Sequence, residues 1–284
     1  MESAESMVGS RKPCLPLTAL LICYALVDCL APAAVSPIVA ALHPSDYLPP
    51  SVAFFGGCLL SQFGAIATWG VLGPGRAIVR WTKSLLATAL LSSALFAACT
   101  LFSQSEPDWQ NFLNFQQCLS VAFLGLQTPV WTLSLGWGYR LCAPGSTTTT
   151  PQRFTLRGLF FAIGVVAATL AVQRVGAAGE PSSLGVAISI GIIGWTGSAW
   201  GLLAVLPCLL TAFLPAAPKR GVKFLAAYVS AISIAPVLAV LVSNEPDRFG
   251  FLLMYAAFCA SVAFMLFGSF LLLRRHGYSL RRIK

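Results

Sequence analysis

The chain has 284 residues, of which 57% are hydrophobic and only 10% are charged. Soluble globular proteins carry about 25% charged residues, so this composition excludes a soluble domain with an ordinary water-facing surface. The net charge of +9 does not indicate nucleic-acid binding, because the positive residues are spread over separate segments, where anionic lipid headgroups account for them better.

Apolar segments near the length of a membrane-spanning helix recur along the whole chain. Such a helix needs about 20 predominantly apolar residues. In chain order, the predicted spans are 15–38, 52–72, 84–102, 116–137, 158–172, 184–206, 224–242 and 251–273. The sixth can continue to Leu214, in which case it is either tilted or interrupted at Pro207. We therefore predict an all-α transmembrane bundle of about eight helices.

Lysine and arginine residues fall in alternate gaps between these spans. Of the 18, all but Arg174 and Arg248 lie in the terminal segments or in the second–third, fourth–fifth and sixth–seventh gaps. Because loops rich in these residues stay cytoplasmic, we expect both termini in the cytoplasm, in a multi-pass protein of the inner or plasma membrane. The predicted order is a cytoplasmic tail, a four-helix half, a flexible connector, a second half and a basic tail, over 1–14, 15–137, 138–157, 158–273 and 274–284.

The first span has an alternative interpretation as a secretory signal peptide. Arg11 and Lys12 precede its apolar run, and small residues follow at 31–34, as at a cleavage site. Cleavage there would leave seven spans with the same orientation of the loops.

The two halves show a short similarity. Residues 106–108 and 245–247 both read Glu-Pro-Asp, and they precede the fourth and the eighth predicted spans. Some transporter families contain parallel internal repeats of this kind. Loops of similar composition in unrelated halves explain the match equally well, so both interpretations stay open.

Asp28 is the only ionisable residue well inside a predicted span. A carboxylate near mid-membrane costs about 2.5–3.5 kcal/mol on insertion scales, so it is expected to face the bundle interior or a polar cavity. Pro32 has no N–H to donate to the carbonyl of Asp28, and Tyr24 lies one turn earlier on the same face. This arrangement can bind a proton or a cation, or it can hold neighbouring helices together.

Glutamines in two other spans complete the predicted polar core. Gln62 in the second span and Gln127 in the fourth are expected to point inward, because an unpaired amide in lipid is unfavourable. We group both with Asp28 and Tyr24 as a candidate proton or cation site. The alternative is that the amides only make packing contacts between helices.

Small residues and a basic turn mark two further surfaces. Gly191, Gly194, Gly197 and Gly201 form one stripe of the sixth span, where a partner helix can approach closely. We interpret this stripe as helix packing, with a dimer face or a substrate groove as the alternative. Arg76 and Arg80 follow a Gly-Pro-Gly turn at the end of the second span, and we expect them to contact lipid headgroups.

No catalytic, metal or cofactor motif occurs in the chain. H-E-x-x-H and G-x-S-x-G are absent, no histidine lies in a predicted span, and the cysteines form no C-x-x-C pair. We therefore predict no enzymatic activity, no metal site and no cofactor.

The leading functional hypothesis is small-solute or ion-coupled transport, with Asp28 as the proton or cation site. The alternative is a non-catalytic membrane scaffold that binds a partner or lipids. The expected partners are membrane lipids and either a second copy of the chain or another membrane protein, and nucleic acid is not expected.

Overall fold

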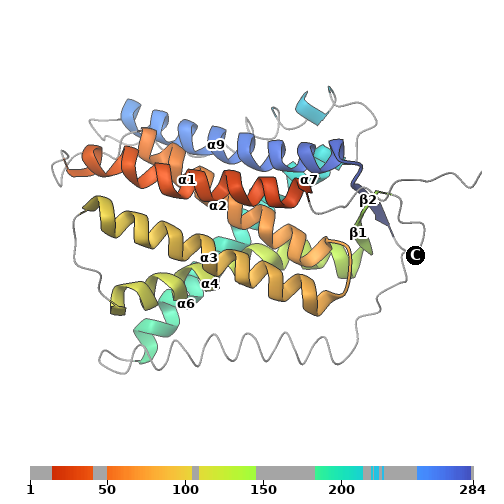
Figure 1. The fold of residues 1–284 in the computed structure, drawn as a ribbon, viewed down its shortest axis with the longest axis horizontal. Coiled ribbons are helices and arrows are strands. Elements are labelled where there is room, and N and C mark those ends of the chain that lie inside the picture. The colour runs from red at the N-terminus through yellow and green to blue at the C-terminus, as the bar shows by residue number, and fades with distance from the viewer. Residues whose placement is uncertain are drawn as a thin grey trace, which may run out of the picture.

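The computed structural model describes residues 15–40, 50–103, 109–144, 183–213, 219, 221–223, 226 and 248–282. Over these residues the chain is mostly helical, with one small sheet at an end of the bundle (Figure 1). The fifth predicted span and nearly all of the seventh lie outside the described residues. The count of eight helices and the internal repeat therefore stay predictions.

The described helices follow the apolar segments of the sequence. They are α1 (Leu15–Ala40), α2 (Pro50–Leu72), α3 (Ala77–Ser103), α4 (Trp109–Gly136), α6 (Ser183–Trp200), α7 (Leu206–Phe213) and α9 (Arg248–Arg275). Among the described residues, five segments are long and apolar enough to cross a membrane, namely Pro50–Leu72, Ala77–Leu101, Phe112–Gly136, Ile192–Phe213 and Leu252–Arg275. In α1 the corresponding apolar stretch, Thr18–Ala34, is shorter. These helices suggest a membrane protein.

The outer face of α1 is apolar, and two of its polar residues point inward. Ile22, Leu26 and Leu30, spaced four residues apart, are more than half exposed. Tyr24 and Asp28, on the opposite side of the helix, are buried. This distribution is the reverse of that on a surface helix of a soluble protein. It suits a helix that faces lipid, where polar groups must find partners inside the protein.

A tight turn separates α2 from α3. The helix α2 ends at Leu72, as predicted, and Gly75 adopts a φ of 94°, which residues with a side chain rarely adopt. The helix α3 then begins at Ala77, seven residues before the predicted span. The prediction followed hydropathy alone, whereas the helix includes a first turn with Arg80 that lies beyond the apolar stretch.

The predicted interruption at Pro207 appears as a π-helical turn just before it. This turn, η1 (Gly201–Val205), joins α6 to α7, and the N–H of Leu206 donates to the carbonyl of Gly201. Pro207 has no N–H, and its ring crowds the preceding turn of the helix. The helix widens by one residue there and continues to Phe213.

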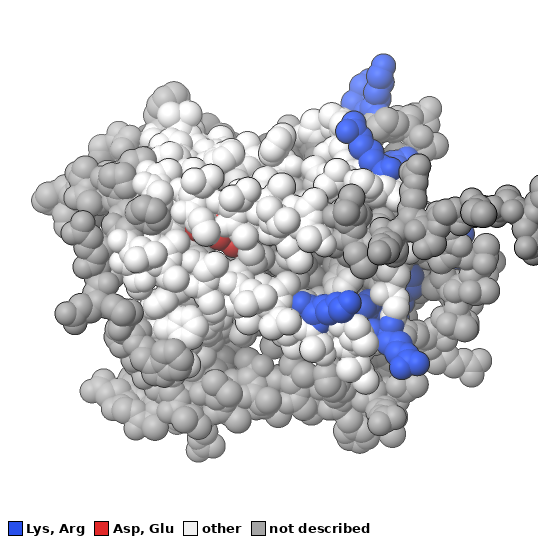
Figure 2. All heavy atoms as spheres, in the orientation of Figure 1, with Lys and Arg blue, Asp and Glu red and all other residues white. Residues whose placement is uncertain are grey.

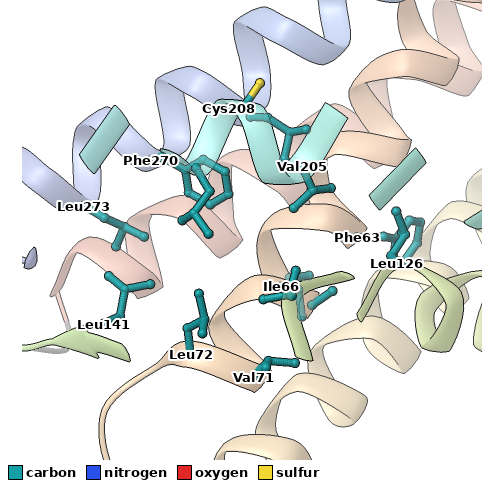
Figure 3. Close-up of a cluster of buried hydrophobic side chains, with 14 of the residues drawn as sticks. Phe63, Ile66, Val71, Leu72, Leu126, Leu141, Val205, Cys208, Phe270 and Leu273 are labelled. Atoms are coloured by element: carbon teal, nitrogen blue, oxygen red, sulfur yellow. The ribbon is translucent and has the colours of Figure 1, made fainter. Parts of the chain in front are cut away.

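The helix α2 is central, and its most extensive contact is with α9. A Cβ on Gly57 would lie 2.7 Å from the carbonyl oxygen of Phe258, so only a glycine allows this approach. Two turns further along the same helix, a Cβ on Gly64 would lie 2.8 Å from the side chain of Val205 in η1. Apolar side chains from α2, α4, η1, α7, α9 and the strand that follows α4 converge beside this contact (Figure 3).

The glycine stripe of the sixth predicted span packs on α4. A Cβ on Gly197 would lie 2.6 Å from the carbonyl oxygen of Ala122, and one on Gly201 would lie 2.8 Å from that of Leu126. The backbone of Gly194 lies against Gly125 of α4. A helix of the same chain, α4, therefore packs against the stripe at these three glycines. The surroundings of the remaining glycine, Gly191, lie outside what the structure describes.

A two-stranded antiparallel sheet was not predicted. Strand β1 (Tyr139–Cys142), in the segment expected to be a flexible connector, pairs with β2 (Ser279–Arg282) in the basic tail. A turn with Gly277 at a φ of 86° brings the tail back after α9. The two strands are too short for their sequences to signal pairing across about 140 positions of the chain, so only the folded structure shows it.

Most described lysines and arginines gather at the end of the bundle that carries the sheet (Figure 2). Arg140 donates to the carbonyl of Val71 at the end of α2, and Arg274 donates to the carbonyl of Ala212 at the end of α7. The ends of α2, α4, α7 and α9 therefore meet at one end of the molecule. The charge pattern of the sequence predicts that these segments lie on one side of a membrane, and the side itself stays a prediction.

We predict that Gly197→Ala destabilises the protein and that Gly268→Ala does not. The added methyl group at Gly197 meets backbone that cannot rotate away, at a typical cost of about 1–3 kcal/mol. At Gly268 of α9 a Cβ meets nothing within 4 Å, and alanine favours the helix by about 1 kcal/mol. Thermal unfolding of the two variants in detergent measures the difference. Equal melting temperatures would contradict the close packing of α6 on α4.

Candidate functional site

Asp28 lies in the middle of α1, on the buried side of the helix. It is 1% exposed, and it is the only Asp or Glu among the described residues. In Figure 2 the described acidic residue shows in red between atoms of uncharged residues, away from the basic end of the bundle. The helix continues through Pro32 to Ala40. The carboxyl group is thus held at mid-length of an apolar helix.

Gln62 of α2 is the side chain that meets this carboxyl group. It is 0% exposed, and its side chain forms a hydrogen bond with the carboxyl group of Asp28. Its amide nitrogen also lies 3.4 Å from the carbonyl oxygen of Tyr24. One glutamine of α2 therefore reaches two positions of α1, one turn apart. The structure thus brings together Asp28, Tyr24 and Gln62, three of the four residues of the predicted polar core.

Tyr24 joins the same region to α9. Its hydroxyl oxygen lies 2.6 Å from Oγ of Ser269, and Ser269 donates its own proton to the carbonyl of Met265 at 2.7 Å. Because a serine has only one hydroxyl proton, the hydroxyl group of Tyr24 is the donor in the pair. Ser269 was missed by the sequence analysis. A single serine in an apolar span carries no signal that distinguishes it from the other serines.

Two buried oxygen atoms of this cluster have no donor among the described residues. They are Oδ1 of Asp28 and Oε1 of Gln62. An ionised carboxylate would leave both acceptors unpaired and a charge without a partner, which is unfavourable in a dry interior. A single proton on Asp28 supplies a hydroxyl donor, and a carboxylic acid and an amide can exchange two hydrogen bonds. The cluster is therefore suited to a proton or to another small donor.

Gln127 belongs to a different place. It is buried, but its amide nitrogen lies 3.8 Å from the position of a Cβ on Gly70, where Ser84 of α3 also packs. Gly70 follows Gln62 by eight residues, or about 12 Å along α2 at 1.5 Å per residue. Gln127 of α4 thus lies beside α2 at a different height from Gln62, and the structure does not bring it to Asp28.

The two arginines of the predicted lipid contact have different surroundings. Arg76 is exposed, whereas Arg80 is 4% exposed and donates through Nη1 to the carbonyls of Gly73 and Gly75. Arg140 donates to Val71 at 3.0 Å, and burial lowers the pKa of its guanidinium from the ordinary value. These contacts cap the end of α2, where the helix dipole favours positive charge.

Metal ligands do not gather in the described part of the chain. No group of three or more His, Cys, Asp or Glu residues lies together there.

Comparison with known proteins adds no family assignment. No family model, no curated protein and no solved structure matches this chain. The function has to be argued from the residues themselves.

The hydrogen bond between Tyr24 and Ser269 can be tested by a double-mutant cycle. We predict that Tyr24→Phe and Ser269→Ala each lower the free energy of unfolding by about 0.5–1.5 kcal/mol, because each removes one interhelical hydrogen bond. The double variant should lose no more than the larger single effect. Chemical or thermal unfolding in detergent provides the measurement, and strictly additive losses would show that the two side chains do not interact.

Proposed function

We propose that this chain is a multi-pass membrane transporter for a small solute or ion, in which Asp28 takes up and releases a proton or a cation. The observation that carries the proposal is the buried carboxyl group at mid-length of α1, with Oδ1 of Asp28 and Oε1 of Gln62 lacking a donor. Ionisable residues inside a membrane commonly mark ion pathways or proton relays. A proton or a bound cation would supply what both oxygen atoms lack.

The cluster also suggests how binding could be coupled to movement. With a proton bound, Asp28 and Gln62 form a neutral pair that joins α1 to α2. Without it, a buried negative charge would favour any conformation in which water or a cation reaches the carboxylate. The helix α1 packs mainly on α3, with smaller contacts to α2 and α9. It is therefore the element whose position we expect to follow the charge on Asp28.

The second candidate function is a scaffold that binds a lipid or a membrane partner without transport. The observation that favours it is the nearly complete burial of Asp28, at 1% exposed. A cluster that joins α1 to α2 and α9 would then only hold the bundle together. The two candidates differ in what the charge of Asp28 does, so one substitution separates them.

We predict that Asp28→Asn abolishes pH-dependent transport and leaves stability unchanged. The amide of an asparagine keeps the shape and the donor of a neutral carboxylic acid, but it cannot release a proton. The assay is proton movement into liposomes that contain the protein and the pH-sensitive dye pyranine, with amino acids, sugars and organic acids added outside. The wild-type rate should fall at least tenfold in the variant, with a melting temperature within about 2 °C.

Gln127→Leu is the matched control, because it removes a buried amide of α4 that lies near Gly70, about 12 Å along α2 from Gln62. Its transport rate should stay within twofold of the wild type. An unaltered rate in Asp28→Asn would refute the role of Asp28 in transport. A wild-type protein with no flux, together with a loss of stability in Asp28→Asn, would favour the scaffold.

We also propose that the end of the bundle with the sheet is cytoplasmic, because it carries most of the described lysines and arginines. In a bacterial host, a green fluorescent protein fused after Lys284 should fluoresce, and alkaline phosphatase fused there should be inactive. Fusions within residues 104–108, in the predicted outer loop, should give the opposite result. The same result at both positions would contradict the proposed topology.

A further inference from the structure

A second cluster with unpaired polar atoms lies at the basic end of the bundle, and it has the opposite chemistry from the cluster around Asp28. Its members carry positive charge and buried N–H donors. The only acidic residue in the described part of the chain, Asp28, lies at mid-length of α1 and not at this end. The positive charges here therefore have no carboxylate partner among the described residues.

Two arginines from separate segments meet at the end of α2. Arg80, in the first turn of α3, donates to Gly73 and Gly75, and Arg140, in β1, donates to Val71. The two guanidinium groups are close enough for their charges to repel one another. The carbonyl groups that they cap carry only a partial charge, equivalent to about half an electron for the whole helix end. Most of the positive charge remains uncompensated.

Two buried donors beside these arginines have no partner in the described structure. They are Nε of Arg80 and the indole Nε1 of Trp69. Both adjoin Gly73, because Arg80 binds its carbonyl and the indole nitrogen lies 3.1 Å from the position of a Cβ on that residue. Buried donors without an acceptor are rare in folded proteins. An acceptor that reaches both would satisfy them together.

The sheet adds a third positive charge. Arg281 of β2 lies directly opposite Arg140 of β1 in the antiparallel register. Like charges at facing positions destabilise a sheet unless an opposite charge lies between them. The first turn of α3 also contains no acidic residue, and its free N–H groups favour an anion.

We propose that Arg80, Arg140 and Arg281, together with the indole of Trp69, bind a phosphate group at the end of α2. A phosphate carries up to two negative charges and several acceptor oxygens, and the planar guanidinium group matches its geometry with paired hydrogen bonds. The phosphate can belong to an anionic lipid headgroup or to a free phosphate compound. The site revises the lipid contact expected from the sequence, since Arg140 replaces the exposed Arg76. It does not depend on the role of Asp28.

The test is ligand-dependent thermal unfolding of the full-length protein in a neutral detergent at constant ionic strength. One arm uses inorganic phosphate, a second uses short-chain phosphatidic acid, and short-chain phosphatidylcholine serves as the zwitterionic lipid control. We expect saturable stabilisation by at least one phosphate-bearing probe and none by phosphatidylcholine. Stabilisation by phosphatidic acid alone identifies a lipid headgroup, and stabilisation by inorganic phosphate as well identifies a site open to free phosphate.

Three variants and a matched control decide whether these arginines form the site. Arg140→Gln and Arg281→Gln should each weaken the apparent affinity about tenfold, whereas Arg275→Gln, an exposed charge at the end of α9, should change it less than twofold. Since Arg140 also caps α2, Arg140→Lys provides a variant that keeps the charge and loses the paired geometry, and it should bind more weakly than the wild type. The proposal is overturned if neither phosphate-bearing probe stabilises the protein saturably. It is also overturned if Arg275→Gln weakens the apparent affinity as much as Arg140→Gln and Arg281→Gln do.

Discussion

The close packing of α2 against α9 is the contact on which the rest of the described structure depends. Gly57 allows the two backbones to approach, and the apolar side chains below them converge from every neighbouring element. In lipid, helices gain little from burying apolar surface, so close packing and internal hydrogen bonds have to hold them together. With α2 and α9 in place, Gln62 and Ser269 both reach α1. Asp28 is placed by these contacts from α2 and α9 together with the packing of α1 on α3.

Two sets of unpaired polar atoms lie at different places along α2. At mid-height, Asp28 and Gln62 present acceptors without donors, and at the basic end Arg80 and Trp69 present donors without acceptors. The interior of a membrane provides no water that could pair with such donors or acceptors. Each set is therefore a place where the protein can take up something from outside: a proton or cation at the first, a phosphate at the second. The two proposals rest on separate observations and can fail separately.

Some of this arrangement was predictable from particular residues. The end of α2 at Leu72 follows from the Gly-Pro-Gly turn, and the inward direction of Asp28 follows from the cost of exposing it to lipid. In two places the structure shows an arrangement that the local sequence does not indicate. Gln127 was grouped with Asp28 because both are polar residues in apolar spans, but a span predicted from hydropathy carries no information on height or rotation. The connector was expected to be flexible because of its composition, yet Tyr139–Cys142 forms a strand with the tail.

The sequence by itself determined the apolar helices, the turn after α2, the glycines that permit close packing and the inward side of α1. These follow from local composition and spacing, which each segment carries alone. Only the tertiary structure decided which faces meet: Gln62 with Asp28, Ser269 with Tyr24, α6 on α4, and Arg140 beside Arg80. Such pairings depend on the rotation and height of each helix relative to its neighbours. Those quantities are set by packing between segments far apart in the chain, and no single segment encodes them.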